Sequence, residues 1–497
     1  MQHGIKDLPE KEIRTSDNNL FSSNTKSYFV LLTLVYVATR ILFCALNKAE
    51  FTDAYIMFNW SWQTSQKWHP LYPLLIKMFS TFLSDPILAG RIISVLCGGI
   101  AVLALWRLTA DVYDLDTANI CAMLLIASPQ FLWTNTRVFT ESLFVAISVG
   151  IVLFSYRAIR FNKSRDAILS IFLSGLAVLT RPDGIILLPC ALWALIHVLK
   201  VNKPQVRTLM LLIPALSSWL IFLVWFMGRD TESTYEGVLL FNLMSSTLSR
   251  ILLFFSTYIE NYPYSLTYPI FLAALSAILW GTLNHSRRIW LIILAYLHLA
   301  VFGMVSIHGW WSSRFLILLL VFVLPESALF FVLLRTKIRK LTWSIVTIGA
   351  ILFSFLFAFI GNYLQTDTYK DVKESAIFVK DNFPTSRVYS DETYKVPFYL
   401  RHDVTRYSPD QSFQAGDILV LHSFHTPLQP ELSQLSTTYD FRPLFVARSR
   451  TMPVLTNSLL ESIAINGQPI TIVKRFEWQR FESIVVQIGK RKGSTPS

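Results

Sequence analysis

An acidic and aromatic segment near the N-terminus contains the first residues whose types could do chemistry. Residues 50–73 hold the acid Asp53, two positions before Tyr55, and close with a stretch that begins at His69 and Pro70. Aromatic rings prefer the boundary between hydrocarbon and water, so this composition predicts a site at a membrane surface. There a carboxylate can deprotonate an acceptor hydroxyl, and an imidazole can donate a charge-assisted hydrogen bond to a phosphate.

Further ionisable residues recur at the ends of apolar runs that we expect to open on the same face. They are Arg137, Glu141, Arg181, Asp183, Asp230, Glu232, Glu236, His308 and Arg314, with Tyr235 among them. Acids and bases mixed on one face of a helical bundle suit a charged amphiphile. Simpler interpretations stay open: Asp53 as a helix N-cap, Glu141 as a first-turn acid, and the arginines as headgroup anchors.

The composition assigns the chain to the membrane class. Of its 497 residues 53% are apolar and only 15% are charged, and the mean hydropathy is +0.46, which excludes an ordinary soluble globule. The net charge of +12 comes largely from short loops between apolar runs, so it indicates membrane orientation and no nucleic-acid partner. All 4 cysteines lie in apolar segments, so neither a disulfide framework nor a zinc cluster is expected.

Apolar runs long enough to cross about 30 Å of hydrocarbon predict a polytopic bundle of about eleven transmembrane helices. The runs cover residues 28–46, 86–108, 117–134, 139–156, 166–180, 184–199, 206–227, 263–283, 288–307, 313–334 and 341–363. Basic residues collect after every second run, for example Arg287 and Arg288 after the eighth. This alternation predicts a cytoplasmic N-terminus, and an odd number of crossings puts the C-terminal region on the opposite side.

The last part of the chain changes character and predicts a small α/β domain. Short β-rich runs at 387–390, 417–422, 444–447 and 484–488 alternate with helix-like stretches at 369–382 and 430–439. We therefore expect a cytoplasmic tail over 1–26, a membrane module over 27–364 with its first outer loop at 48–85, and an extracytoplasmic soluble domain over 365–497. No phosphate loop or nucleophile elbow is evident in this domain, so we expect it to shape the acceptor side.

Arg40 and Glu326 are two of the charges that fall inside apolar runs. Arg40 lies about 9 Å from the outer end of the first predicted helix, so we expect its side chain to snorkel to the surface. Glu326 lies deep in the tenth run and should cost a few kcal/mol unless it is paired. The sequence names no partner for it.

Five short stretches recur in an order that resembles a known family. They are Thr52–Tyr55, Trp68–Leu75, Thr140–Phe144, Gly175–Gly184 and Ser313–Leu316. Together they resemble the GT-C superfamily of polytopic membrane glycosyltransferases, in the branch of protein O-mannosyltransferases and aminoarabinose transferases. The resemblance implies transfer of a sugar from a polyprenyl-phosphate donor to a hydroxyl of a protein, lipid or glycan at the outer or lumenal face.

By that resemblance Asp53 would be the base of an inverting transfer and Glu141 the second acid of the site. The substrate-binding residues would be His69, Tyr55, Arg137, Arg181, Arg314 and His308. The chain departs from the family pattern in two ways, because Ala54 replaces the acid often found beside the first-loop aspartate and only one proline directly follows His69. No cofactor is required, and a divalent metal is possible but without support.

Other classes of function remain as alternatives. A transporter or flippase for a lipid-linked substrate should show an internal repeat or midplane acids, and we find no clear repeat. A receptor or scaffold would leave the outer polar residues unexplained. Among compartments, we favour the bacterial plasma (inner) membrane over the endoplasmic reticulum.

Overall fold

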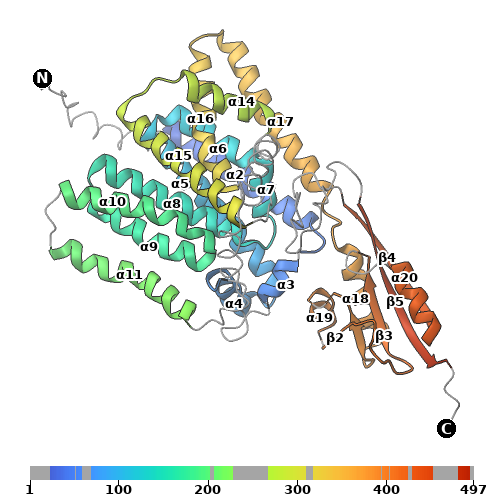
Figure 1. Ribbon diagram of the computed structural model, residues 1–497. Helices are drawn as coiled ribbons and strands as arrows, with labels where there is room; N and C mark the ends of the chain where they lie inside the picture. The colour runs from blue at the N-terminus through green and yellow to red at the C-terminus, as the bar shows by residue number, and fades with distance from the viewer. Residues whose placement is uncertain are drawn as a thin grey trace, which may run out of the picture.

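The computed structural model describes residues 23–50, 52–58, 69–201, 206–227, 267–308, 317–392, 394–401, 403–423, 428–451 and 479–492. Figure 1 shows a helical bundle followed by a smaller domain built on a β-sheet. The bundle helices are α2 (Ser23–Leu46), α5 (Pro86–Val112), α6 (Leu115–Ala127), α7 (Pro129–Asn135), α8 (Thr140–Phe161), α9 (Ser164–Thr180), α10 (Leu188–Val201), α11 (Val206–Met227), α14 (Tyr268–Trp280), α15 (His285–His308), α16 (Ile317–Arg335) and α17 (Lys340–Tyr363).

Every apolar run of the sequence falls on a helix of the bundle. The run at 117–134 is split into α6 and α7, and the run at 184–199 begins in a short 3-10 helix, η1 (Pro182–Leu187), that leads into α10. Among the described residues 5 helices are long and apolar enough to cross a bilayer, and the α6–α7 pair, bent by 63°, makes a sixth if it is one span. The helical membrane fold is therefore confirmed, whereas eleven crossings remain a prediction.

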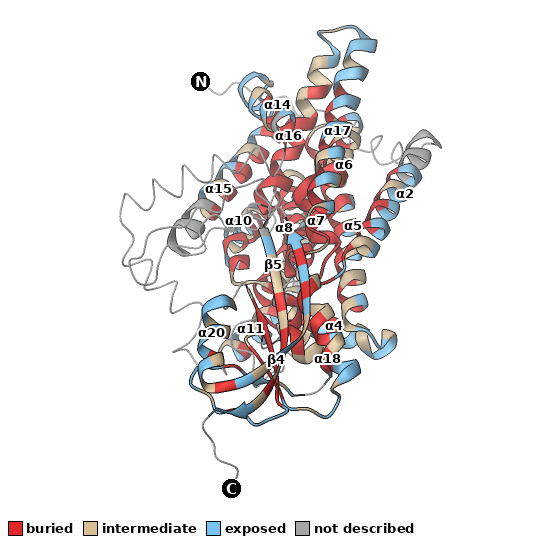
Figure 2. Cartoon of the chain, turned by 90° about the vertical axis from the view of Figure 1, so that its right-hand side faces the viewer, coloured by how far each residue is buried: buried red, intermediate tan, exposed pale blue. Residues whose placement is uncertain are grey.

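Helix α8 lies at the centre of the bundle and α17 lies at its rim. In the apolar window of α8 83% of the residues are buried, against 22% in α17, which leaves α17 with a broad face for lipid (Figure 2). Several polar side chains inside the bundle are bonded to neighbours: the hydroxyls of Ser155 and Ser170, for example, lie 2.7 Å apart between α8 and α9. Such pairing removes the cost of burying a hydroxyl in an apolar interior.

The bend between α6 and α7 explains Arg40. Pro129 cannot continue the hydrogen-bond ladder of α6, so carbonyls at the end of that helix need other donors. Arg40 Nη1 donates to the Ile126 carbonyl at 3.0 Å, and Ser354 Oγ donates to the Ala127 carbonyl at 3.1 Å. The Arg40 side chain is fully buried, so the expectation that it snorkels to the surface is wrong.

The partner of Glu326 is an arginine from another helix. Arg287 Nη2 lies 2.8 Å from Glu326 Oε2, and the Tyr113 hydroxyl donates to the other carboxylate oxygen. Both charged side chains are 1% exposed or less, and Arg287 also donates to the carbonyls of Ala277 and Thr282. From the sequence we expected Arg287 to be one of the basic loop residues that orient the chain in the membrane. In the structure it neutralises the charge of Glu326, the buried acid of α16.

The C-terminal domain is a mixed five-stranded sheet with helices. The strands are β1 (Val388–Ser390), β2 (Thr405–Arg406), β3 (Ile418–His422), β4 (Tyr439–Thr451) and β5 (Gln479–Arg491), in the order β2-β1-β3-β5-β4. β1 pairs in parallel with β2 and β3, and β5 pairs antiparallel with β3 and β4. The helices are α18 (Lys370–Asn382), α19 (Lys395–Leu400) and α20 (Leu428–Thr438). All six sequence-predicted elements are confirmed in type.

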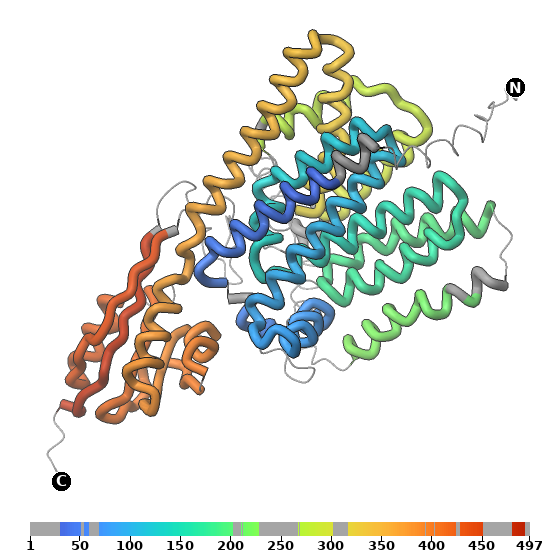
Figure 3. The backbone as a smooth tube through the Cα atoms, turned by 180° about the vertical axis from the view of Figure 1, so that it is seen from behind, coloured from blue at the N-terminus to red at the C-terminus, as the bar shows by residue number. Residues whose placement is uncertain are grey.

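Two short helices of the first loop lie at the end of the bundle that faces the C-terminal domain. They are α3 (Thr52–Phe58) and α4 (Leu71–Leu83) (Figures 1 and 3). Lys48 Nζ lies 2.7 Å from Asp367 Oδ1, and Lys373 Nζ donates to the Lys48 carbonyl at 3.0 Å. The first loop and the C-terminal domain therefore lie at the same end of the bundle; that both lie on the extracytoplasmic side of the membrane stays a prediction.

Candidate active site

The best-defined group of ionisable side chains lies where α8 begins and α9 ends. Antiparallel packing of these neighbouring helices brings Glu141, in the first turn of α8, beside Arg181, directly after α9. Arg181 precedes Pro182, which disfavours helical geometry for it, and its backbone is extended with φ −155° and ψ 144°. Pro182 then opens η1, which carries Asp183 back towards the same arginine.

Two carboxylates share the Arg181 guanidinium. Nη1 lies 2.8 Å from Glu141 Oε1, and Nη2 lies 2.8 Å from Asp183 Oδ2. Thr140 Oγ1 donates to the second oxygen of Glu141 at 3.3 Å, and the guanidinium lies 5.7 Å from the centre of the Phe144 ring. Glu141 is only 2% exposed, so this charge pairing is largely shielded from water. With one cation for two anions, the three charges sum to −1.

His69 reaches the same region from the loop before α4. Its Nδ1 is hydrogen-bonded to the carbonyl of Val178, in the last turn of α9. The imidazole lies 4.7 Å from the Trp225 ring and stacks with Phe222 at 6.5 Å, both from α11. The structure thus brings His69, Glu141 and Arg181 to one end of α9, although 112 positions separate the first from the last in the sequence.

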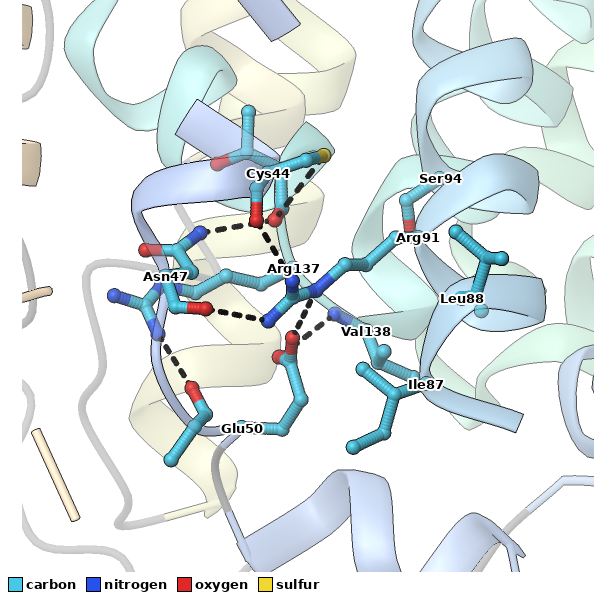
Figure 4. Close-up of polar contacts among 12 residues, drawn as sticks. Cys44, Asn47, Glu50, Ile87, Leu88, Arg91, Ser94, Arg137 and Val138 are labelled. Carbon is cyan, nitrogen blue, oxygen red and sulfur yellow. Dashed lines mark hydrogen bonds and ion pairs between the residues drawn. The ribbon is translucent and has the colours of Figure 1, made fainter. Parts of the chain in front are cut away.

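A second polar cluster holds the first loop against the bundle (Figure 4). Glu50 accepts hydrogen bonds from Arg91 Nε at 2.6 Å and from the Val138 amide at 3.1 Å. Arg91 also donates to the carbonyls of Cys44, at 2.7 Å, and Asn47, at 3.0 Å. No role was predicted for Glu50 or Arg91 from the sequence. The available signal was an arginine within the apolar run 86–108 and an acid near the beginning of the first outer loop.

Arg137 and Tyr55 belong to this second cluster. Arg137 is fully buried and donates to the carbonyls of Ala49, at 3.3 Å, and Gln365, at 2.9 Å. Tyr55 is also fully buried, and its hydroxyl lies 2.6 Å from that of Tyr399. Burial, together with the Tyr399 hydroxyl, raises the pKa of Tyr55 well above its ordinary value, so the phenol stays protonated. These contacts show how both side chains are held; the substrate-binding roles expected of them stay predictions.

Three of the residues expected in the site are described only in part or not at all. The backbone of Asp53 lies in the first turn of α3, and His308 ends α15, but their side chains lie outside the described structure. Arg314 lies outside the described residues, as do Asp230, Glu232, Tyr235 and Glu236. The roles expected of Asp53, His308 and Arg314 stay predictions.

Among the described residues, no group of three or more His, Cys, Asp or Glu side chains is placed to hold a metal ion. The carboxylates of Glu141 and Asp183 are each directed at Arg181. Metal dependence stays an open expectation.

Part of this chain matches a protein family. Residues 67–225 match the family described as dolichyl-phosphate-mannose-protein mannosyltransferase, and this range contains His69, Glu141, Arg181 and Asp183. No curated protein sequence matches the chain.

Solved structures of low sequence identity share the fold. ArnT from Cupriavidus metallidurans in the apo state is 10% identical with a TM-score of 0.56, over 96% of this chain and 100% of ArnT. The same enzyme bound to undecaprenyl phosphate is 11% identical with a TM-score of 0.50, over 95% and 100% of the two chains.

The oligosaccharyltransferase of Archaeoglobus fulgidus, in complex with Zn and sulfate, is 15% identical with a TM-score of 0.50. The match covers 77% of this chain but only 63% of the oligosaccharyltransferase. The chain therefore shares its fold with ArnT, and its residues 67–225, which carry the site, are similar to the dolichyl-phosphate-mannose-protein mannosyltransferase family.

Proposed function

We propose that the chain transfers a sugar from a polyprenyl-phosphate donor to an acceptor hydroxyl at the end of the bundle that faces the C-terminal domain. The observation that carries the proposal is the buried group of Glu141, Arg181 and Asp183, built where α8 begins and α9 ends within the matched segment. A polyprenyl tail suits the lipid-facing helices, and its phosphate would lie at the same level as these charges. The ArnT structure with undecaprenyl phosphate supports the donor class by analogy.

The proposed chemistry is an inverting displacement. Asp53, in the first turn of α3, takes the proton of the acceptor hydroxyl, whose oxygen attacks the anomeric carbon of the sugar. The bond from that carbon to the phosphate oxygen breaks, and the polyprenyl phosphate leaves with the bonding electrons. We propose that Arg181, His69 and Arg314 donate hydrogen bonds to the leaving phosphate as it gains charge, which the position of Arg181 and His69 at one end of α9 supports.

In this proposal Arg181 has two tasks. It orients Glu141 and Asp183, and its cation attracts the donor phosphate, so phosphate and carboxylates share one guanidinium. Glu141 is the second acid of the site. The acceptor is a hydroxyl of a protein, a lipid or a glycan, and we place the reaction on the extracytoplasmic side of a bacterial plasma membrane.

A transfer assay tests this function. Purified protein in liposomes is incubated with radiolabelled undecaprenyl-phosphate sugars and with candidate acceptors, and labelled product is counted. We expect transfer by the wild type and a loss of about 100-fold or more in Asp53→Asn, because one positioned base contributes roughly that factor. Asp116→Asn is the matched control, since Asp116 forms an exposed pair with Arg335 at 3.0 Å.

Each result has a clear consequence. Wild-type turnover in Asp53→Asn would remove Asp53 from the mechanism. Absence of transfer from every polyprenyl-phosphate sugar, by protein that is folded and correctly inserted, would overturn the function itself.

A further inference from the structure

Helix α3, which carries Asp53, is held between two bodies. Its residues Ala54 and Met57 are buried in the core of the bundle. Tyr55 and Phe58 pack against Phe398 of α19, with ring centres 5.1 and 5.3 Å away, and Phe58 also touches the edge of the bundle core. Both pairs are spaced three residues apart, so each lies on one face of the helix. One face of α3 therefore contacts the membrane bundle and another contacts the C-terminal domain.

One direct side-chain hydrogen bond crosses this contact at Tyr55. Its hydroxyl lies 2.6 Å from the Tyr399 hydroxyl, and the Glu50 amide donates to the same oxygen at 3.2 Å. Burial raises the pKa of Tyr399 to about 12, so both phenols stay protonated over the physiological range. Glu50 is itself held by Arg91. The hydroxyl of Tyr399 thus continues a chain of bonds that begins inside the bundle.

Other contacts between the loop and the domain lie nearer to water. The pair of Lys48 and Asp367 is 49% and 32% exposed, and pairs of that kind contribute little to stability. The Tyr55–Tyr399 contact, in which Tyr55 is fully buried and Tyr399 partly so, is less screened, and it joins α3 directly to α19. It is therefore the contact best placed to transmit the position of the domain to α3.

We propose that the C-terminal domain positions the helix that carries Asp53, and that Tyr399 is the positioning residue through which it does so. This inference rests on the proposed function, because it assigns the domain a task in the same transfer. Tyr399 touches no reacting atom. It restricts α3 at Tyr55, two residues from Asp53. This restriction increases the fraction of protein molecules in which the base is correctly placed.

Two phenylalanine variants test the proposal, because they remove a hydroxyl and keep the ring. For Tyr399→Phe we expect kcat at saturating donor to fall about fivefold while the donor KM changes less than twofold, since a net hydrogen bond contributes roughly that factor. Amide hydrogen exchange in residues 52–58, followed by mass spectrometry, should rise by about the same factor. Tyr55→Phe should lower kcat at least as much, because it also removes the acceptor of the Glu50 amide. The double variant should add little to Tyr55→Phe, because that variant has already lost the bond between the two hydroxyls.

Tyr407→Phe is the matched control, since its hydroxyl bonds to Glu431 within the C-terminal domain. We expect that variant to leave both kcat and the exchange of α3 unchanged. Unchanged exchange in Tyr399→Phe, or fully additive effects of the two variants, would overturn the positioning role. If the wild type transfers no sugar while Tyr399→Phe still loosens α3, the proposed function fails and the contact between domain and loop stands.

Discussion

Arg181 and Glu141 form an ion pair with 2.8 Å between Nη1 and Oε1, although 40 residues separate them in the chain. The pair joins the end of α9 to the beginning of α8, and Asp183 holds the other side of the guanidinium. The side chains of Arg181 and Glu141 are 14% and 3% exposed, so water offers little compensation if one partner is lost.

Removing Arg181 should therefore damage transfer more than removing a surface arginine. We expect Arg181→Ala to lower the transfer rate roughly 100-fold, because two partly buried carboxylates are left to repel each other. The rate is measured together with the unfolding temperature in detergent. Arg335→Ala is the control, since its pair with Asp116 is exposed. A wild-type rate in Arg181→Ala would remove this arginine from the site.

The buried pair of Arg287 and Glu326 should matter for stability and less for transfer. Arg287→Ala leaves Glu326 as an uncompensated charge between α15 and α16, which should lower the free energy of unfolding by about 3–5 kcal/mol. Replacing both residues with apolar ones, Arg287→Met with Glu326→Leu, should restore much of that loss. Thermal unfolding of all three proteins checks this, and a double variant less stable than Arg287→Ala would contradict it.

Gly175 should tolerate no side chain, because α9 and α11 approach closely there. A Cβ at Gly175 would lie 2.2 Å from Ser218 Oγ and 3.0 Å from the Ser218 backbone carbon. We expect Gly175→Ala to displace α11 and lower the stability by about 1–3 kcal/mol. At Gly349 of α17 nothing lies within 4 Å, so Gly349→Ala should cause no loss. Equal unfolding temperatures for the two variants would show that the close approach is absent.

The stability of the C-terminal domain should depend on pH through Asp371. Burial raises the pKa of Asp371, but hydrogen bonds from His422, Ser449 and Ser483 outweigh it, and the net pKa lies below the ordinary value. A lowered folded-state pKa stabilises the fold above the unfolded-state pKa, and this contribution is lost as the pH falls through the folded-state value.

We therefore expect the wild type to unfold at a higher temperature than Asp371→Asn. The difference between the two unfolding temperatures should be largest at about pH 6 and should shrink below about pH 4. The measurement compares the two proteins at each pH, so that the titration of other carboxylates cancels. A difference that stays constant down to about pH 3 would show that this carboxylate does not titrate as proposed.

Much of the fold was predictable because it depends on local patterns. Long apolar runs must form helices in a membrane, since every backbone group needs an internal partner, and all of them fall on helices. The Arg181-Pro182 step likewise predicts where α9 stops. The gathering of His69, Glu141 and Arg181 at one end of the bundle follows from the alternation of helix directions.

The sequence by itself thus determined a polytopic helical protein, its mixed α/β C-terminal domain and most of the polar side chains that meet near α9. Only the tertiary structure determined which group each buried polar side chain contacts. Glu326 with Arg287, Arg40 with the Ile126 carbonyl, and Tyr55 with Tyr399 are separated by 39, 86 and 344 positions. The reason is physical: a buried charge or hydroxyl must be satisfied, but which distant group satisfies it depends on how the helices pack.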